Sequence, residues 1–187
     1  MTPAQPSRNV EGGNPSAAAA ANAMKAIHIA KITLNVGAGK DEELLKKGLK
    51  LLERLSPVPP VKTITQKRIP GWGLRPGLAI GGKVTIRKDT EKLLRRLLAA
   101  KEFTLPESNF DQCGNFSFGI PEYVDIEGLE YDPDLKILGL EVAVTVERPG
   151  YRIKRRKIRP QTVGKSHQVT KQEAIAFVRN LGINITV

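Results

Sequence analysis

The chain has 187 residues, 40% of them hydrophobic, which is enough for one compact domain with its own core. Lys and Arg outnumber Asp and Glu by 30 to 19, and the net charge of +11 favours a polyanionic partner over an acidic protein or a neutral substrate. The single cysteine, Cys113, cannot form an internal disulfide, and the sequence has no run of about 20 apolar residues that could span a bilayer. We therefore expect a cytoplasmic protein, with RNA, DNA or an anionic membrane surface as candidate partners.

Residues 1–23 differ in composition from the rest of the chain. They are rich in Ala, Asn, Ser, Pro and Gly, and Arg8 and Glu11 are their only charged side chains. Such a segment buries too little apolar surface to offset the entropy of ordering it. We predict that residues 1–23 form a low-complexity, disordered extension and that residues 24–187 form a single domain.

The first half of the domain shows strand and helix patterns. Roughly alternating apolar residues from Ile27 to Val36 predict a strand, and the leucines of residues 44–55 recur at helical spacing after the acidic cluster at 41–43. Residues 61–66 and 83–87 also resemble strands. A long loop is expected between them at residues 69–82, which hold five glycines and two prolines.

The second half continues the mixed α and β pattern. Asp89 is expected to cap a helix that ends near Lys101, and a Gly- and Pro-rich stretch covers residues 106–133. A strand is predicted at 137–146. Thr170 and Glu173 have the spacing of a capping box, which predicts a further helix, followed by a short strand at 183–187.

Charge is segregated along the chain. Residues 54–101 hold twelve basic and two acidic side chains, residues 102–147 hold one and eleven, and residues 148–187 hold ten and one. The modest net charge therefore hides two strongly basic blocks on either side of an acidic one. Such a chain is suited to a polyanion on one side and to a different partner on another.

The densest basic run covers residues 148–159, where seven of twelve side chains are Lys or Arg. Tyr151 within it is available to stack on a base or sugar, and the cations suit phosphate contacts. A solvated charged face is the alternative. We favour RNA contact, because seven like charges repel one another unless counter-charge is near.

The loop at 69–82 combines the only tryptophan, Trp72, with Arg68, Arg75 and Lys83. Its glycines permit close backbone approach to a ligand, so the loop is interpreted as a contact finger. The alternative is that Trp72 packs onto the domain beside Ile69.

Enzymatic interpretations have little support. Residues 37–40 (GAGK) follow a strand like a phosphate-binding loop, but Leu34 replaces its first glycine and Asp41 stands where a Ser or Thr is needed. The two histidines, His28 and His167, have no partner at metal-ligand spacing. The carboxylates of residues 122–134 show no calcium-loop spacing and are interpreted as solvated acidic surface or as a site for a basic protein. We expect no catalytic residue, metal or cofactor.

Five segments together resemble one family: Lys31 to Gly39 (KITLNVGAG), Gly71 to Arg87 (GWGLRPGLAIGGKVTIR), Phe110 to Gly119 (FDQCGNFSFG), Tyr131 to Pro133 (YDP) and Arg148 to Lys157 (RPGYRIKRRK). They are similar to the archaeal and eukaryotic branch of the universal large-subunit ribosomal protein five family, which binds 5S ribosomal RNA. The similarity extends from about Lys25 to Val187. It implies an α+β domain, an antiparallel sheet with helices packed on one face, and it places 5S rRNA on the sheet.

The resemblance also implies site residues. The expected rRNA-binding residues are Asn35, Thr63, Thr65, Lys67, Arg68, Lys83, Thr85, Arg87, Arg148, Tyr151, Arg152, Lys154, Arg155 and Arg156. The loop expected to reach P-site tRNA comprises Pro70, Gly71, Trp72, Gly73, Arg75 and Gly77. The family's Gly-Gln after its first helix is replaced by Pro57 and Val58, which removes one RNA contact.

The prediction from sequence is thus a non-catalytic component of the large ribosomal subunit in the central protuberance. Its expected partners are 5S rRNA, 23S rRNA, P-site tRNA, neighbouring large-subunit proteins of the 5S particle and a basic small-subunit protein across an intersubunit bridge, with no membrane partner. The main alternative is a free-standing RNA-binding or ribosome-assembly factor. A phosphate-binding enzyme using residues 37–40 is a more distant one.

Overall fold

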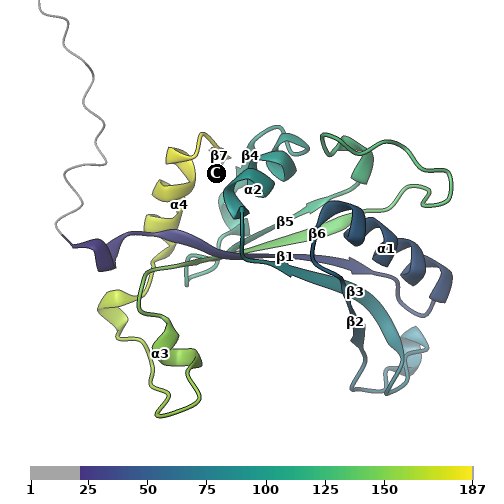
Figure 1. The fold of residues 1–187 in the computed structure, drawn as a ribbon, viewed down its shortest axis with the longest axis horizontal. Helices are drawn as coiled ribbons and strands as arrows, with labels where there is room; N and C mark the ends of the chain where they lie inside the picture. Colours follow the sequence, from purple (N-terminus) through teal and green to yellow (C-terminus); the bar gives the residue numbers. More distant parts are fainter. Residues whose placement is uncertain (1–21, 187) are drawn as a thin grey trace, which may run out of the picture.

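The computed structural model describes residues 22–186. Its centre is a five-stranded antiparallel sheet in the order β2-β3-β1-β6-β5 (Figure 1). The strands are β1 (His28–Gly37), β2 (Val61–Ile64), β3 (Ala79–Ile86), β5 (Phe116–Ile120) and β6 (Leu140–Glu147). This confirms the expected antiparallel sheet of an α+β fold.

Helices cover only one face of this sheet. The α-helices are α1 (Glu42–Leu55), α2 (Thr90–Ala99), the short α3 (Arg152–Arg155) and α4 (Lys171–Asn180). In the view of Figure 1, α1 and α2 lie above the sheet, whereas α3 and the hairpin end of β2 and β3 project below it at opposite sides. The lower face of the sheet is therefore flanked by two appendages.

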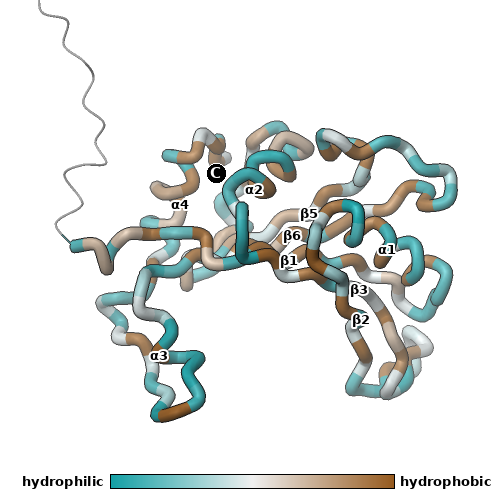
Figure 2. Tube along the Cα trace, viewed as in Figure 1, coloured by the Kyte–Doolittle hydropathy of each residue, from teal (hydrophilic) through white to brown (hydrophobic). Residues whose placement is uncertain are grey.

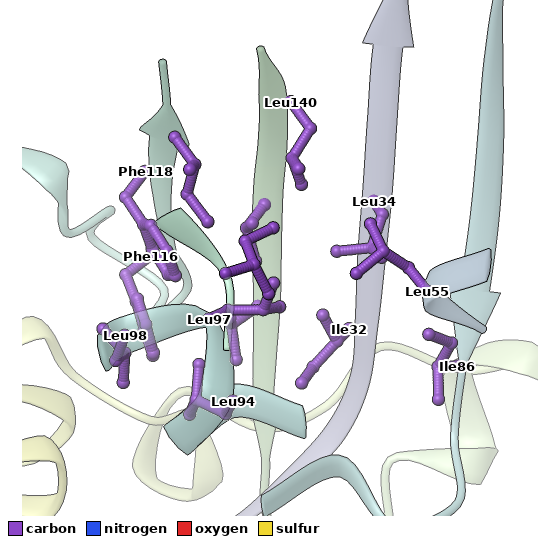
Figure 3. Packing of buried hydrophobic residues seen from close by; sticks show 14 of the residues in the cluster. Ile32, Leu34, Leu55, Ile86, Leu94, Leu97, Leu98, Phe116, Phe118 and Leu140 are labelled. Atoms are coloured by element: carbon purple, nitrogen blue, oxygen red, sulfur yellow. The ribbon is translucent and has the colours of Figure 1, made fainter. Parts of the chain in front are cut away.

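The core lies between the sheet and the helices. Alternation places Ile32 and Leu34 of β1 on the helix side, where they are fully buried. Figure 3 shows the α2 leucines pointing toward the phenylalanines of β5, and Leu55 of α1 beside Leu34. A bulge in β1 between Ile29 and Lys31 lets Ile29 join the same core despite its odd spacing from Ile32.

A small second sheet closes the other end of the core. Strand β4 (Thr104–Pro106) pairs in parallel with β7 (Asn184–Thr186), the predicted final strand. Helix α4 begins with the predicted capping box: the Thr170 hydroxyl accepts from the Glu173 backbone N–H, and the Glu173 carboxylate accepts from the Thr170 backbone N–H. Ala174 and Val178 of α4 are buried against the core.

Short 3-10 helices occupy the connections: η1 (Ala23–Lys25), η2 (Pro70–Trp72), η3 (Glu107–Asn109), η4 (Tyr123–Asp125) and η5 (Lys165–His167). Figure 2 shows that hydrophobic stretches follow the strands, while the connecting segments and the outer turns of the helices are largely hydrophilic. No helix in the described range 22–186 is long and apolar enough to cross a bilayer. The predicted disordered extension lies almost wholly in residues 1–21, outside the described residues.

Three sequence-based boundaries need correction. Residues 79–82 belong to β3 and not to the loop, since they pair with β1 and β2. Their glycines meet a steric need of the sheet and do not mark a turn. A Cβ on Gly81 would lie 2.6 Å from the Val36 carbonyl oxygen, and one on Gly82 would lie 2.7 Å from Leu49 Cδ2. The stretch 106–133, to which no strand was assigned, contains β5, whose Phe116 and Phe118 are buried. The strand expected from residue 137 begins at Leu140, and Ile137 is exposed.

Helix α2 also differs in detail. It ends at Ala99 and not near Lys101, because Glu102 and Phe103 adopt positive φ values of 52° and 53° that break the helix. Asp89 occupies the N-cap position as expected, but its own φ of 51° leaves its side chain without a capping hydrogen bond.

Candidate nucleic-acid interface

The open face of the sheet carries short polar and small side chains. Alternation puts Thr33 and Asn35 of β1 on this face, and the strand register sets Thr33 opposite Thr85 and Asn35 opposite Lys83 of β3. Strand β2 adds Thr63, which pairs with Gly81. Neighbouring strands lie about 4.8 Å apart, so these side chains form one contiguous polar surface. We call it the sheet face.

Asn35 is held in place by a carboxylate from the next strand. Its amide nitrogen donates to Glu141 Oε2 of β6 at 3.0 Å. Farther along β6, Glu147 accepts from Arg155 at 2.5 Å. Both carboxylates on the sheet face are thus engaged by intramolecular donors, which lowers their repulsion toward a polyanion.

Much of the sheet face is shallow. Gly37, Ser117, Gly119 and Ala143 lie on this side of β1, β5 and β6, and none has a side chain longer than a hydroxymethyl group. A flat floor of this kind permits close approach of a bulky backbone. Among the expected contact residues, Lys83 and Arg87 are exposed at its β3 side.

Thr65 has a different environment from the other expected strand contacts. It lies just beyond β2, its side chain is buried, and its hydroxyl has no hydrogen-bond partner among the described residues. Its backbone joins the loop instead: Thr65 N–H donates to Leu78 O at 2.8 Å, and Gly77 N–H donates to Thr65 O at 2.9 Å. We interpret Thr65 as the foot of the loop.

The loop between β2 and β3, residues 65–78, is a hairpin end shaped by its own backbone. Ile69 and Leu74 exchange two backbone hydrogen bonds of 3.1 Å around η2, and Gly73 makes the turn with a φ of 67°. Trp72 is 71% exposed, which excludes the alternative that it packs into the core, whereas Leu74 is buried. The expected contacts Lys67, Arg68, Pro70, Gly71 and Arg75 are all exposed along this loop.

The basic run forms a separate projection, residues 149–164, which we call the arm. Its short helix α3 and the turn after it expose Arg152, Lys154, Arg156, Lys157 and Arg159 to solvent. The backbone turns back where Arg156 Nε donates to Arg159 O at 2.8 Å. The arm therefore presents a concentrated cationic surface beside the sheet face.

Two of the expected contacts anchor the arm to the domain. Arg148 is only 8% exposed and its guanidinium donates to Glu173 of α4 at 2.7 Å. The Tyr151 hydroxyl accepts from Val169 N–H at 3.1 Å and donates to His167 O at 3.4 Å. Arg148 is therefore occupied as a structural ion pair, and only the ring of Tyr151 is left for a ligand.

The contacts of Glu173 also shift the pKa of its carboxyl group. The Thr170 backbone N–H, and then the Arg148 guanidinium, lower the pKa of Glu173 below its ordinary value. The Glu173 carboxylate thus stays charged over a wider range of pH, and its ion pair with Arg148 is kept over the same range. No comparable network of side chains joins the loop to the domain within residues 22–186.

The acidic segment, residues 122–134, lies away from the sheet face, next to α1. Asp132 accepts from Arg54 at 2.6 Å and lies 3.4 Å from Lys50, and Asp134 lies 3.5 Å from Lys50. The Asp134 backbone N–H, the Arg54 guanidinium and the Lys50 ammonium lower the pKa of Asp132. Glu122, Asp125, Glu127 and Glu130 are exposed and form no ion pair within the described part of the chain.

The residues that suggested a phosphate-binding loop are otherwise engaged. The backbone N–H groups of Ala38 and Gly39 both donate to Ile80 O, at 2.8 and 3.0 Å, so they are not available to cradle a phosphate.

One of the two histidines is also engaged, since His167 Nε2 lies 2.8 Å from Pro149 O. Within residues 22–186 no group of three or more His, Cys, Asp or Glu side chains could hold a metal ion.

Sequence reasoning missed three parts of this surface. Glu141 and Glu147 were counted only as acidic residues, although their partners, Asn35 and Arg155, were both expected contacts. Lys31 was quoted only within a motif, yet it lies on the sheet face opposite Thr145. Strand alternation would have placed Lys31 there, whereas the contact between Asn35 and Glu141 depends on pairing across 106 residues.

Comparison with known proteins identifies the relatives of this chain. A family model for the C-terminus of the ribosomal protein uL5 family matches residues 79–177. A protein of Nanoarchaeum equitans named large ribosomal subunit protein uL5 is 47% identical over 165 residues, 87% of this chain and 97% of its own. Proteins of the same name from Sulfolobus acidocaldarius and Methanosphaera stadtmanae are 41% and 39% identical over 167 residues, 89% of this chain and 93% and 99% of theirs.

Fold and surface thus define an α+β protein with a polar, shallow sheet face and a cationic arm beside it. The chain belongs to the uL5 family of large-subunit ribosomal proteins.

Proposed function

We propose that this protein anchors 5S rRNA to the large ribosomal subunit through its sheet face, within the central protuberance. Membership of its family makes it a structural component of the cytoplasmic large subunit and not an enzyme. The observation that carries the finer proposal is the sheet face itself. It is polar, shallow and left uncovered by the helices, and Lys83 and Arg87 lie along its β3 side.

The chemistry of this face suits folded RNA. Threonine and asparagine side chains can bond 2′-hydroxyl and phosphate oxygens, which is how proteins read RNA shape. Lys and Arg neutralise phosphates and release counterions, so affinity should fall steeply with salt. We assign Asn35, Thr63, Lys83, Thr85 and Arg87 to direct rRNA contact, and we leave Arg148 out because it is buried in its pair with Glu173.

The two appendages extend the proposed surface. The exposed cations of the arm, Arg152, Lys154 and Arg156, are proposed to contact 5S rRNA or adjacent 23S rRNA. The loop, with Trp72 and Arg75 exposed, is proposed to reach P-site tRNA. An exposed indole and a guanidinium are groups that stack on nucleic-acid bases and sugars.

The acidic segment is proposed to face proteins. Glu122, Asp125, Glu127 and Glu130 repel RNA and are exposed, and the segment after β5 that carries them lies on the helix side of the sheet in Figure 1. A basic small-subunit protein across an intersubunit bridge would complement them. Neighbouring large-subunit proteins of the 5S particle remain proposed partners as well, without assigned residues.

The test is binding of 5S rRNA across a salt series, with wild type compared with a Thr85→Ala/Arg87→Ala variant. A Lys92→Ala variant on the exposed side of α2, which also removes one positive charge, is the matched control. Wild type and control should prefer 5S rRNA over a scrambled RNA of the same length, and the sheet variant should lose that preference while staying folded. Equal binding by all three proteins would contradict the assignment to the sheet face.

A free-standing assembly factor is the second candidate function, because the same surface would serve it. Comigration separates the two. A structural component should remain with large subunits after a high-salt wash, whereas a transient factor should be released.

A further inference from the structure

A cavity of about 430 Å³ lies at the corner where the sheet face meets the foot of the arm. Lys31 of β1 and Thr145 of β6 contribute from the sheet, and Tyr151, Lys154 and Gln168 contribute from the arm and the segment after it. We call it the corner cavity. Ligand pockets in proteins range from about 300 to 1,000 Å³, so this space suits one small group and not a helix of RNA.

We propose that the corner cavity receives a single unstacked nucleotide of the RNA that lies on the sheet face. The inference rests on the proposed function, and it adds a site at which the protein reads one base. Lys31 and Thr145 are paired across β1 and β6, one position beyond the Thr33–Ala143 pair on the same face. The cavity is therefore continuous with the sheet face, and a nucleotide of bound RNA can reach it without leaving that surface.

The charges of the cavity suit a phosphate group. Its lining holds three cations, Lys31, Lys154 and Arg155, against one carboxylate, Glu147. Glu147 is neutralised by Arg155 at 2.5 Å. Lys31 and Lys154 form no ion pair with any residue in the described range, so both ammonium groups are left for an anion.

Two amide side chains give the cavity a donor and an acceptor. Asn115 Oδ1 accepts from the Val146 backbone N–H at 3.3 Å. This bond uses the amide oxygen, so the Asn115 amide nitrogen remains as a donor. Gln168 Nε2 donates to Val163 O at 3.2 Å, which leaves Gln168 Oε1 as an acceptor. A nucleobase edge offers the complementary acceptor and donor.

The aromatic ring of Tyr151 supplies a third element. Its hydroxyl is bound to Val169 N–H and His167 O, so the ring is fixed before any ligand arrives. A base can stack on such a ring at little entropic cost, because the ring has no freedom left to lose. The cavity thus offers lysines for the phosphate, amides for the edge of the base and an aromatic ring for its face.

The first test uses Cys113, which lines the cavity and is the only cysteine of the chain. The rate of its alkylation by N-ethylmaleimide is measured for the free protein, the protein with 5S rRNA, and the protein with AMP or UMP alone. We expect several-fold slower alkylation with 5S rRNA and no change with either mononucleotide. Protection by AMP or UMP alone would overturn the inference in favour of a free-nucleotide site.

The second test distinguishes insertion from simple coverage of the cavity. Gln168→Ala and Lys154→Ala remove exposed groups of the lining, and Gln161→Ala and Lys46→Ala, the latter on α1, are controls on exposed side chains outside it. Each lining variant should bind 5S rRNA about tenfold more weakly than its control, the loss expected from about one base contact. A scan of abasic positions in the RNA should find one that weakens wild type and has no further effect on Gln168→Ala.

The outcomes separate this inference from the function on which it rests. If 5S rRNA binds specifically but Cys113 reacts at an unchanged rate and the lining variants equal their controls, the cavity is empty in the complex and only the inference fails. If wild type shows no preference for 5S rRNA, the proposed function fails and the inference fails with it.

Discussion

The arm and the loop flank the same sheet face, but they are held in different ways. The arm is fixed by side chains: Arg148 pairs with Glu173, the Tyr151 hydroxyl bonds Val169 N–H, and Arg155 pairs with Glu147. The loop is shaped by backbone hydrogen bonds around Gly73 and exposes its tryptophan. The arm is therefore sensitive to the loss of a single side chain, whereas the loop keeps its backbone hydrogen bonds when one of its side chains is replaced.

The largest expected effect comes from breaking the anchor of the arm. Arg148→Met should lower the free energy of unfolding by about 2 kcal/mol, because it removes a buried guanidinium from Glu173; the loss is limited because Glu173 is partly exposed to water. Urea unfolding measures this. Arg152→Met, an exposed arginine of the same run, should change stability by less than about 0.5 kcal/mol. Equal midpoints for the two variants would show that the arm is not anchored by Arg148.

The second largest effect concerns the Tyr151 hydroxyl. Tyr151→Phe keeps the ring but leaves the N–H of buried Val169 without its acceptor, so stability should fall by about 1–2 kcal/mol. Thermal unfolding at neutral pH is the measurement. Tyr131→Phe, on an exposed tyrosine, is the control. Unchanged stability of Tyr151→Phe would mean that the hydroxyl does not position the ring.

The third effect depends on pH. The folded-state pKa of Glu173 is lowered, so its ionised form stabilises the fold above the ordinary glutamate pKa, and this contribution is lost as pH falls through the lowered pKa. Glu173→Gln should therefore be less stable than wild type at pH 7, by about 1 kcal/mol after allowance for solvent screening of a 41% exposed side chain.

The difference between Glu173→Gln and wild type should shrink in acid. Below the range in which Glu173 titrates, the wild-type carboxyl is neutral like the amide, and the two unfolding curves should converge. A difference that stays constant from pH 7 into acid would mean that Glu173 acts through packing and not through charge.

The smallest expected effect is at the loop. Trp72→Ala should change the free energy of unfolding by less than about 0.5 kcal/mol, because the indole touches little of the domain. The affinity for 5S rRNA should stay within about twofold, because the loop is proposed to contact tRNA instead. Tryptophan emission of wild type should have the red-shifted maximum of a solvated indole, and this protein has no other tryptophan to obscure it. A blue-shifted emission would contradict the exposed position of Trp72.

Local patterns predicted much of the fold. The alternation of Ile32, Leu34 and Val36 assigned β1 its two faces, and the capping-box spacing of Thr170 and Glu173 located the start of α4. Both signals are local. Strand β5 was missed because its short Phe-Ser-Phe alternation lies in a stretch dominated by glycine, proline and acidic residues, and only pairing with β6 shows it to be a strand.

The candidate site was harder to predict than the fold. Several of its polar residues were named from the family resemblance, but the resemblance gave no contact between them. Asn35 and Glu141 are 106 residues apart, and no periodicity connects them. Nor does a run of seven cations indicate which of them is buried: Arg148 anchors the arm while Arg152 faces water. Burial depends on the position of α4, which is decided in three dimensions.

The position of β1 has a consequence for synthesis of the protein. This strand lies at the centre of the sheet, yet Asn35 must wait for Glu141, 106 residues later, before its second neighbour exists. Lys83, the first partner of Asn35, precedes Glu141 by 58 residues, so at about 5–20 residues per second translation leaves this strand half-paired for roughly 3 to 12 seconds. Unpaired strand edges of this kind are prone to aggregate. The nascent chain is therefore most in need of a chaperone between the emergence of β3 and that of β6.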